Sequence, residues 1–261
     1  MKSINKSEYA FQDLIEIIEV LRSKEGCPWD MQQTHKSLRE TVLEESYEVI
    51  EAINLDDKNN LKEELGDLLL QVVLHAQIAS ENKDFTINNI ITTLCEKLIR
   101  RHPHIFNGEK LETKEDVNNR WEQIKKEEKN YNSISEIMKG VPKALPALIR
   151  AQKVQKKAAK VGFDFGKMEE ALDKVFEEID ELKEAYNNQN IDEIDEEFGD
   201  LIFAIVNLSR FFGLNAEFSL TNAVEKFITR FEGVEKLATK EGKKLEDMTL
   251  KEMDTLWERI K

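Results

Sequence analysis

Two short acidic motifs occur twice in the sequence, with a spacing suited to binding a cation. The first copy reads EESYE at residues 44–48 and ELGD at 64–67, and the second reads EEIDE at 177–181 and EFGD at 197–200. Residues three or four apart share one face of a helix. We therefore expect four carboxylates to gather in each copy: Glu45, Glu48, Glu64 and Asp67 in the first, and Glu178, Glu181, Glu197 and Asp200 in the second.

These acids lie on the apolar side of their predicted helices. On a helical wheel, Glu45 falls among Leu38 and Val49, and Glu64 shares a face with Leu68. The second copy repeats this arrangement. Ionised carboxylates on a core-facing surface are unfavourable unless a cation compensates them, and four clustered acids repel one another. The pattern therefore indicates a cation site in each copy rather than a solvated run of charge.

The residue types favour a hard metal ion. No histidine occupies any of the acidic positions, and all four histidines lie before residue 105, so the second copy has none. An all-oxygen site suits Mg²⁺, with Mn²⁺ as a substitute. A carboxylate-bridged iron bundle is the alternative, although such bundles use Glu-x-x-His pairs. His75 faces the predicted core, but Leu208 replaces it in the second copy, so we expect a packed core histidine rather than a ligand.

Cations and tryptophans also recur in both copies. Lys97 and Arg101 match Lys226 and Arg230, each pair four residues apart on a predicted helix. Magnesium in proteins commonly serves substrate phosphates, and the chain has no glycine-rich phosphate loop. These cations are therefore candidates for phosphate contacts. The recurring tryptophans, Trp121 and Trp257, suit either stacking on a base or anchoring of the core.

The elements that carry these residues form an internal repeat. Residues 43–78 align with 176–211 at a constant offset of 133 without a gap, and later segments match in the same order. Glycine and prolines cluster at the join, in NYNSISEIMKGVPKALP. We predict an all-α fold of two tandem helical-bundle domains, residues 1–130 and 151–261, with a linker over 131–150.

Composition narrows the partners of the chain. Its 261 residues are 40% hydrophobic and 34% charged, and the net charge is −14. A polynucleotide-binding protein normally presents a basic surface, so a nucleic-acid polymer is not expected as a partner. No apolar run is long enough to cross a bilayer, which predicts a cytoplasmic protein. Cys27 and Cys95 form no metal-binding or disulfide pattern.

The paired motifs resemble the EExxE and ExxD signatures of the MazG nucleotide pyrophosphohydrolases, which belong to the all-α NTP pyrophosphatase superfamily. GCPWDMQQTHKSL, RRHPHIF and RAQKVQKKAAKVGFDF extend the resemblance over almost the whole chain. It implies Mg²⁺-dependent cleavage of nucleoside triphosphates between the α and β phosphates, in a homodimer. One departure is local: family members can carry a lysine shortly before the ExxD acid, where Glu193 and Asn60 stand here.

The resemblance also implies roles for individual residues. Glu178, Glu181, Glu197 and Asp200 would hold metal, Lys226, Arg230 and Trp257 would contact the nucleotide, and Glu177 or its counterpart Glu44 would accept a proton from water. Glu45, Glu48, Glu64, Asp67, Lys97, Arg101 and Trp121 occupy the matching first-copy positions. We favour the second copy as the catalytic one. A non-catalytic helical interaction module is the remaining alternative.

Overall fold

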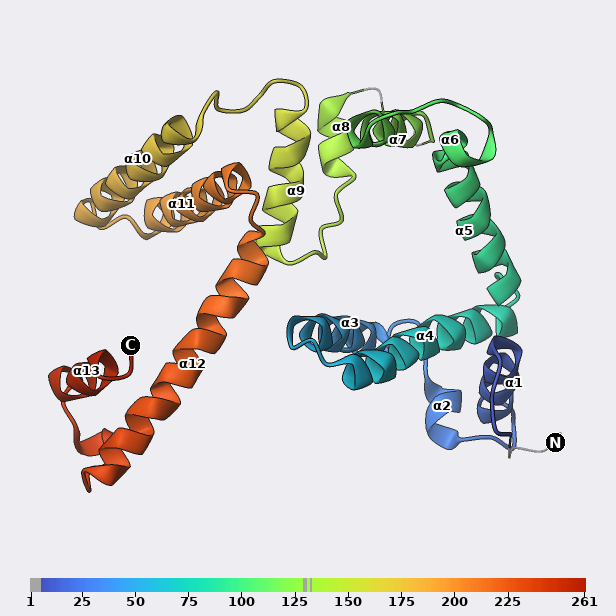
Figure 1. The fold of residues 1–261 in the computed structure, drawn as a ribbon, viewed down its shortest axis with the longest axis horizontal. Helices are drawn as coiled ribbons and strands as arrows, with labels where there is room; N and C mark the ends of the chain where they lie inside the picture. The colour runs from blue at the N-terminus through green and yellow to red at the C-terminus, as the bar shows by residue number, and fades with distance from the viewer. Residues whose placement is uncertain (1–5, 129–130, 132) are drawn as a thin grey trace. The chain divides into compact units, whose positions relative to one another are not determined.

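The computed structural model describes residues 6–128, 131 and 133–261, and within these ranges the chain consists of helices and loops without a β-strand (Figure 1). It divides into two compact units, residues 1–125 and 126–261. The predicted all-α fold is confirmed. The predicted domain boundary at residue 130 falls outside the described residues, so its exact place stays a prediction.

The first unit is built around an antiparallel helical hairpin, α3 and α4. Helices α1 and α5 pack against α4, and α6 follows α5 directly. The helices of this unit are α1 (Phe11–Leu21), α2 (Pro28–Gln32), α3 (Arg39–Asn54), α4 (Lys58–Glu81), α5 (Ile87–Arg101), α6 (Pro103–Phe106) and α7 (Lys114–Glu128), the last of which ends just past the division.

The second unit repeats the hairpin as α10 and α11. Helix α9 packs against α11 and α12, and α12 packs against α13. Within the segment 131–150, for which we predict a linker, α8 forms and packs against α9. The helices of this unit are α8 (Ile134–Lys139), α9 (Ala147–Ala159), α10 (Met168–Asn187), α11 (Ile191–Phe211), α12 (Ala216–Lys240), the 3-10 helix η1 (Leu245–Asp247) and α13 (Leu250–Glu258).

The two hairpins turn in the same way. In the first, the N–H of Asp57 bonds to the carbonyl of Ala52 at 3.0 Å, which closes the end of α3 as a Schellman motif. Asp56, between the helices, has a positive φ of 52°. Asp57 then caps α4 by accepting hydrogen bonds from the N–H groups of Asn59 and Asn60. This short turn forces α4 to run back along α3.

A small apolar cluster stabilises the packing of helices within each unit. In the first unit, Ile18 of α1 packs with Leu38, Val73, Leu74 and Ile78. In the second, Val234 and Ala238 of α12 pack with Leu256 of α13. These clusters fix α1 on α4 and α13 on α12.

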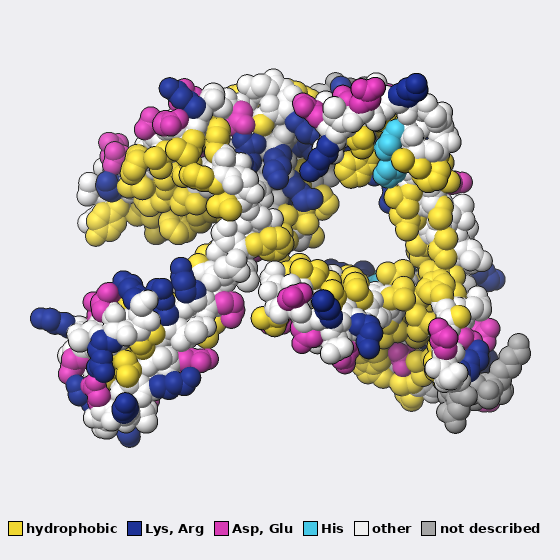
Figure 2. Space-filling model, in the orientation of Figure 1, with side chains coloured by type: hydrophobic (Ala, Val, Ile, Leu, Met, Phe, Trp, Pro, Cys, Tyr) yellow, Lys and Arg dark blue, Asp and Glu magenta, His cyan; other side chains and the backbone are white. Residues whose placement is uncertain are grey.

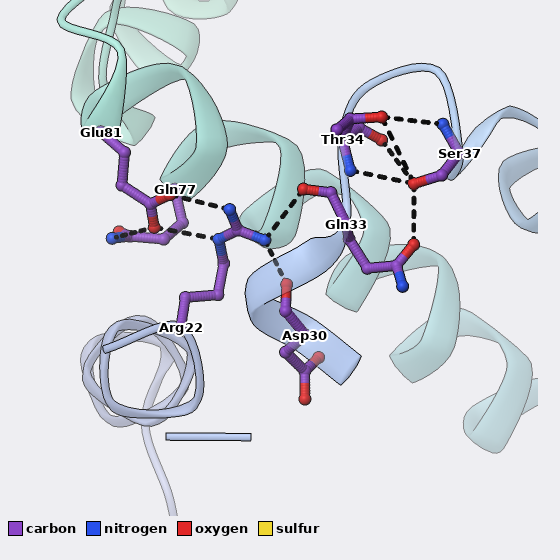
Figure 3. Close-up of polar contacts among 7 residues, drawn as sticks. All are labelled: Arg22, Asp30, Gln33, Thr34, Ser37, Gln77 and Glu81. Atoms are coloured by element: carbon purple, nitrogen blue, oxygen red, sulfur yellow. Dashed lines mark hydrogen bonds and ion pairs between the residues drawn. The ribbon is translucent and has the colours of Figure 1, made fainter. Parts of the chain in front are cut away.

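A buried arginine connects the C-terminal end of α2 to the long helix α4 (Figure 3). Arg22 donates two hydrogen bonds to the carboxylate of Glu81, at 2.9 and 2.8 Å. It also donates to the backbone carbonyls of Asp30 and Gln33. The Arg22 side chain is only 5% exposed. In the second unit a different ion pair connects the loop before α10 to α11: Arg210 of α11 pairs with Asp164 at 2.5 Å.

No single described helix is both long and apolar enough to cross a membrane. Helices α11 and α12 together would meet that test on length and composition, but they are bent by 102° at the short break between them.

Candidate metal centre

Three of the four predicted carboxylates of the first unit converge. Glu45 and Glu48 of α3 and Glu64 of α4 each offer an oxygen that lies within 4.8 Å of the others. Asp67, one turn after Glu64, lies outside this group of three, although its charge acts on Glu45. The antiparallel hairpin thus brings acids from two helices to one point, as the motif spacing predicts.

The second unit gathers a related but different set of three acids. Glu178 of α10 meets Glu197 and Asp200 of α11 within the same 4.8 Å limit. Glu178 is buried, with 5% of its surface exposed, while Asp200 is exposed. Glu181 is exposed and lies outside the group of three, although the charge of Glu197 acts on it.

The electrostatics of the carboxylates show that they are crowded. Burial, followed by the charges of Asp67 and Glu48, raises the pKa of Glu45. Burial and the charge of Glu48 likewise raise the pKa of Glu64. In the second unit, burial is the main cause that raises the pKa of Glu181 and Glu197. These carboxyl groups hold their protons more tightly than usual, because burial and neighbouring negative charges both disfavour the ionised form.

The structure adds a residue that motif reasoning missed. Lys174 of α10 donates to Glu177 at 2.7 Å and lies 2.8 Å from an oxygen of Glu178. Its hydrogen bonds to these two glutamates raise the pKa of Lys174. The signal was present in the sequence, because Lys174 precedes Glu178 by four residues, the spacing of a helical ion pair. Glu177, the predicted proton acceptor, is therefore occupied by an ammonium group.

The predicted phosphate contacts of the second unit lie on a different helix from the acids. Lys226 and Arg230 are on α12, which packs mainly against α9 and α13. In the described part of this unit, neither forms an ion pair with the carboxylate cluster. Arg230 instead lies over the ring of Trp257, 5.9 Å from its centroid. Trp257 also contacts Phe227, at a ring separation of 5.2 Å.

The first unit pairs its tryptophan with two cations. The ammonium of Lys125 lies 3.8 Å from the ring centroid of Trp121, and the guanidinium of Arg101 lies 6.0 Å from it. Lys97 is half-buried on α5. Each unit thus brings the predicted arginine to the predicted tryptophan. The packing of one ring face by Lys125 distinguishes Trp121 from Trp257.

No histidine belongs to either carboxylate group among the described residues. His75 of α4 is half-buried and shares a hydrogen bond of 2.7 Å with His35, between their Nδ1 atoms. Burial and the neighbouring His35 lower the pKa of His75. Among the described residues, the groups with ligand geometry contain only Asp and Glu. A hard divalent cation fits such a set of oxygen donors.

The sequence relationships agree with this arrangement. The model of the MazG nucleotide pyrophosphohydrolase domain matches residues 33–106 and 167–236. A Thermotoga maritima protein named nucleoside triphosphate pyrophosphohydrolase/pyrophosphatase MazG is 47% identical over 251 residues, which cover 96% of this chain and 95% of that protein. The Escherichia coli nucleoside triphosphate pyrophosphohydrolase is 43% identical over 251 residues, 95% of each chain.

A longer relative contains the same region. The uncharacterized protein YabN of Bacillus subtilis is 46% identical over 257 residues, which cover 97% of this chain and 52% of that protein. The two domain matches each include one helical hairpin and its converging carboxylates, and together they span more than half of the chain. The protein therefore belongs to the MazG nucleotide pyrophosphohydrolase family.

Proposed function

We propose that the chain hydrolyses nucleoside triphosphates to nucleoside monophosphate and pyrophosphate, by cleavage between the α and β phosphates. The observation that carries this proposal is the meeting of three carboxylates from facing helices in each unit. Family membership supports the pyrophosphohydrolase class, and the relatives in Thermotoga maritima and Escherichia coli are named for that activity.

The oxygen-only donor sets fit Mg²⁺, with Mn²⁺ as a substitute. The raised pKa values of Glu45, Glu64, Glu181 and Glu197 support a cation there, because a bound cation would relieve the repulsion among these acids. When bound, divalent ions neutralise phosphate charge and orient a water molecule for attack. The residues that would hold them are Glu45, Glu48, Glu64 and Asp67 in the first unit, and Glu178, Glu181, Glu197 and Asp200 in the second.

The remaining residues of the chain would bind substrate and move a proton. Lys226 and Arg230, with Lys97 and Arg101 as their counterparts, would pair with phosphate oxygens. Glu177, or Glu44 in the first unit, would accept the proton of the attacking water. For Glu177 this requires release of Lys174, which holds its carboxylate at 2.7 Å.

We also propose that the chain acts as a homodimer. The α10–α11 hairpin exposes large apolar side chains, and Figure 2 shows hydrophobic residues gathered over these helices. Phe176, Phe198 and Phe203 are 56%, 54% and 45% exposed. Contiguous exposed apolar surface of this kind marks an interaction site. A second copy seated on the hairpin would cover this apolar surface.

Separate substitutions in the two clusters test the activity. Purified Glu64→Gln and Glu197→Gln variants would be assayed for pyrophosphate release from NTPs and dNTPs with Mg²⁺. If a cluster is essential for catalysis, we expect neutralisation of one of its metal-binding acids to lower the rate of pyrophosphate release by about 100-fold or more. Glu184→Gln on the exposed side of α10 is the matched control and keeps its activity. Release of no pyrophosphate by the unmodified protein from any nucleotide would overturn the proposal.

The assay also separates the two units. Loss in Glu197→Gln alone would place catalysis in the second unit, whereas equal losses would require both. Analytical ultracentrifugation of the same proteins tests the dimer, and a monomer at micromolar concentration would contradict it.

A further inference from the structure

The two units differ at one repeat position beside their carboxylate clusters. Lys174 of α10 corresponds to Thr41 of α3 at the repeat offset of 133. Lys174 lies one turn before Glu178, and its ammonium is 2.8 Å from that buried carboxylate. A threonine at the same place has no charge to offer. The second unit thus carries its own counter-ion, and the first unit lacks one at that position.

The surroundings of the two clusters agree with this difference. The positive charge of Lys174 lowers the pKa of both Glu181 and Glu197, and so opposes the effect of the other acids. The main influences on the pKa of Glu45 and Glu64 are burial and neighbouring carboxylates, which all raise it. The acids of the first unit are therefore the less compensated set.

The facing helix differs in a complementary way. On the facing helix α4, Gln71 lies four residues, about one helical turn, after Asp67. Gln71 is 5% exposed, and its Oε1 has no hydrogen-bond partner among the described residues. The second unit has Ala204 at the equivalent position. On α4 of the first unit, Gln71 thus offers a neutral oxygen without a hydrogen-bond partner among the described residues. On α11 of the second unit, Ala204 offers only a methyl group.

Lys174 already neutralises part of the charge of Glu178, so a metal ion that enters the second cluster competes with it for that carboxylate. Thr41 offers no such competitor in the first cluster. We propose that Lys174 is an internal counter-ion that competes with the divalent metal ion, so that without nucleotide the first unit binds the ion more tightly. The difference should be about tenfold or more, the factor that corresponds to one charge-assisted hydrogen bond. This inference rests on the proposed metal-dependent function and adds a difference between its two sites.

The test is a titration of the full-length, nucleotide-free protein with Mn²⁺, in which the free ion is followed by electron paramagnetic resonance. Glu64→Gln should remove the tighter class of sites, while Glu197→Gln should leave it intact. Two reciprocal swaps then exchange the determinant: Lys174→Thr should strengthen the weaker class by about tenfold, and Thr41→Lys should weaken the tighter class by a similar factor.

A matched control separates local competition from total charge. Lys183→Thr removes an exposed lysine from the same helix, where it pairs with Asp180 at 2.8 Å. It should leave both classes of sites unchanged. Equal affinities of the two units in the unmodified protein would overturn the proposal. So would equal effects of Lys174→Thr and Lys183→Thr, or an absence of nucleotide-free Mn²⁺ binding.

Circular dichroism establishes that each variant is folded. If a swap variant unfolds, the comparison of Glu64→Gln with Glu197→Gln still decides which unit binds Mn²⁺ more tightly, because both of these variants keep Thr41 and Lys174. The outcome is independent of the proposed activity, since pyrophosphate release from the unmodified protein is measured separately. Normal release with equal Mn²⁺ affinities would reject the inference and retain the function.

Discussion

Asp56 and Gln189 occupy the same left-handed position in the two hairpin turns, with φ values of 52° and 56°. Each stands one residue before the cap of the following helix, Asp57 or Asn190. The turns position the paired helices and hence the carboxylates of both clusters. Neither position is glycine, although the left-handed region costs an ordinary residue free energy that glycine does not lose.

Replacement of these residues by glycine should therefore stabilise the protein. We expect Gln189→Gly to raise the free energy of unfolding by about 0.5–1 kcal/mol, and Asp56→Gly by less, because aspartate tolerates left-handed backbone better than glutamine. Urea titration measures both changes. Destabilisation by Gln189→Gly would show that its side chain, rather than its backbone, matters in the turn.

Arg22 should be among the most important polar residues for the stability of the first unit. Substitution by methionine keeps the apolar stem but removes the donor to the carbonyls of Asp30 and Gln33, and it leaves Glu81 with a hydrogen bond from Gln77 alone. We expect destabilisation by about 2 kcal/mol in urea titration, less than for a fully buried ion pair, because the Glu81 side chain is 37% exposed. Lys6→Met removes an exposed ion pair with Asp13 and should have little effect. Equal effects of the two substitutions would refute the role of Arg22.

The hairpins and their acids follow from local patterns in the sequence. The repeat and the helical periodicity are sufficient to place Glu45 near Glu64 and Glu178 near Glu197, because a short turn between two amphipathic helices leaves only an antiparallel arrangement. The Arg22–Glu81 pair is different, since 59 residues separate its members and neither has a local motif. Such contacts depend on which helices pack together, and periodicity does not report that choice.

The packing of α12 illustrates the same limit, while the nucleotide contacts themselves stay a prediction. Helix α12 carries Lys226 and Arg230 at a helical spacing that fits a phosphate site, but it packs mainly against α9 and α13. The sequence pattern identifies the face of a helix and not its neighbour. Lys174, by contrast, was within reach of sequence reasoning, because comparison with Thr41 exposes a charge difference between the repeats.

The two tryptophans should differ in their effect on stability. Trp257 contacts Phe227 and packs against the cluster of Val234, Ala238 and Leu256. Trp257→Ala should therefore cost about 2–4 kcal/mol of unfolding free energy. Trp121 is 37% exposed, and Trp121→Ala should cost about 1 kcal/mol, mostly through the lost contact with Lys125. Similar costs in urea titration would mean that Trp121 is also a core anchor.

Substitution of Trp257 by phenylalanine separates its role in packing from a contact with substrate. Trp257→Phe retains an aromatic ring in the cluster, so most of the lost stability should return. If Trp257 stacks on the base, the variant should still show a raised KM for the nucleotide, with kcat changed less. An unchanged KM would leave Trp257 with a structural role alone.

The stabilising effect of the metal ion should increase with pH. Glu45, Glu64, Glu181 and Glu197 have pKa values raised above the usual 4.5. In the metal-free protein, their ionisation weakens the folded state as pH rises through these raised values, because the unfolded chain ionises the same groups more easily. A bound cation reverses this, but it must displace any protons that the carboxylates hold.

We therefore expect the rise in Tm caused by Mn²⁺ to be small near pH 5 and larger near pH 7.5. The affinity for Mn²⁺ should fall by up to about tenfold for each unit by which the pH is lowered, for each proton displaced. Differential scanning fluorimetry with and without Mn²⁺ measures this. Glu64→Gln removes one of the four groups, so it should raise the Tm of the metal-free protein at neutral pH and reduce the response to Mn²⁺. A metal-induced shift that is the same at both pH values would contradict the link between these protons and the cation site.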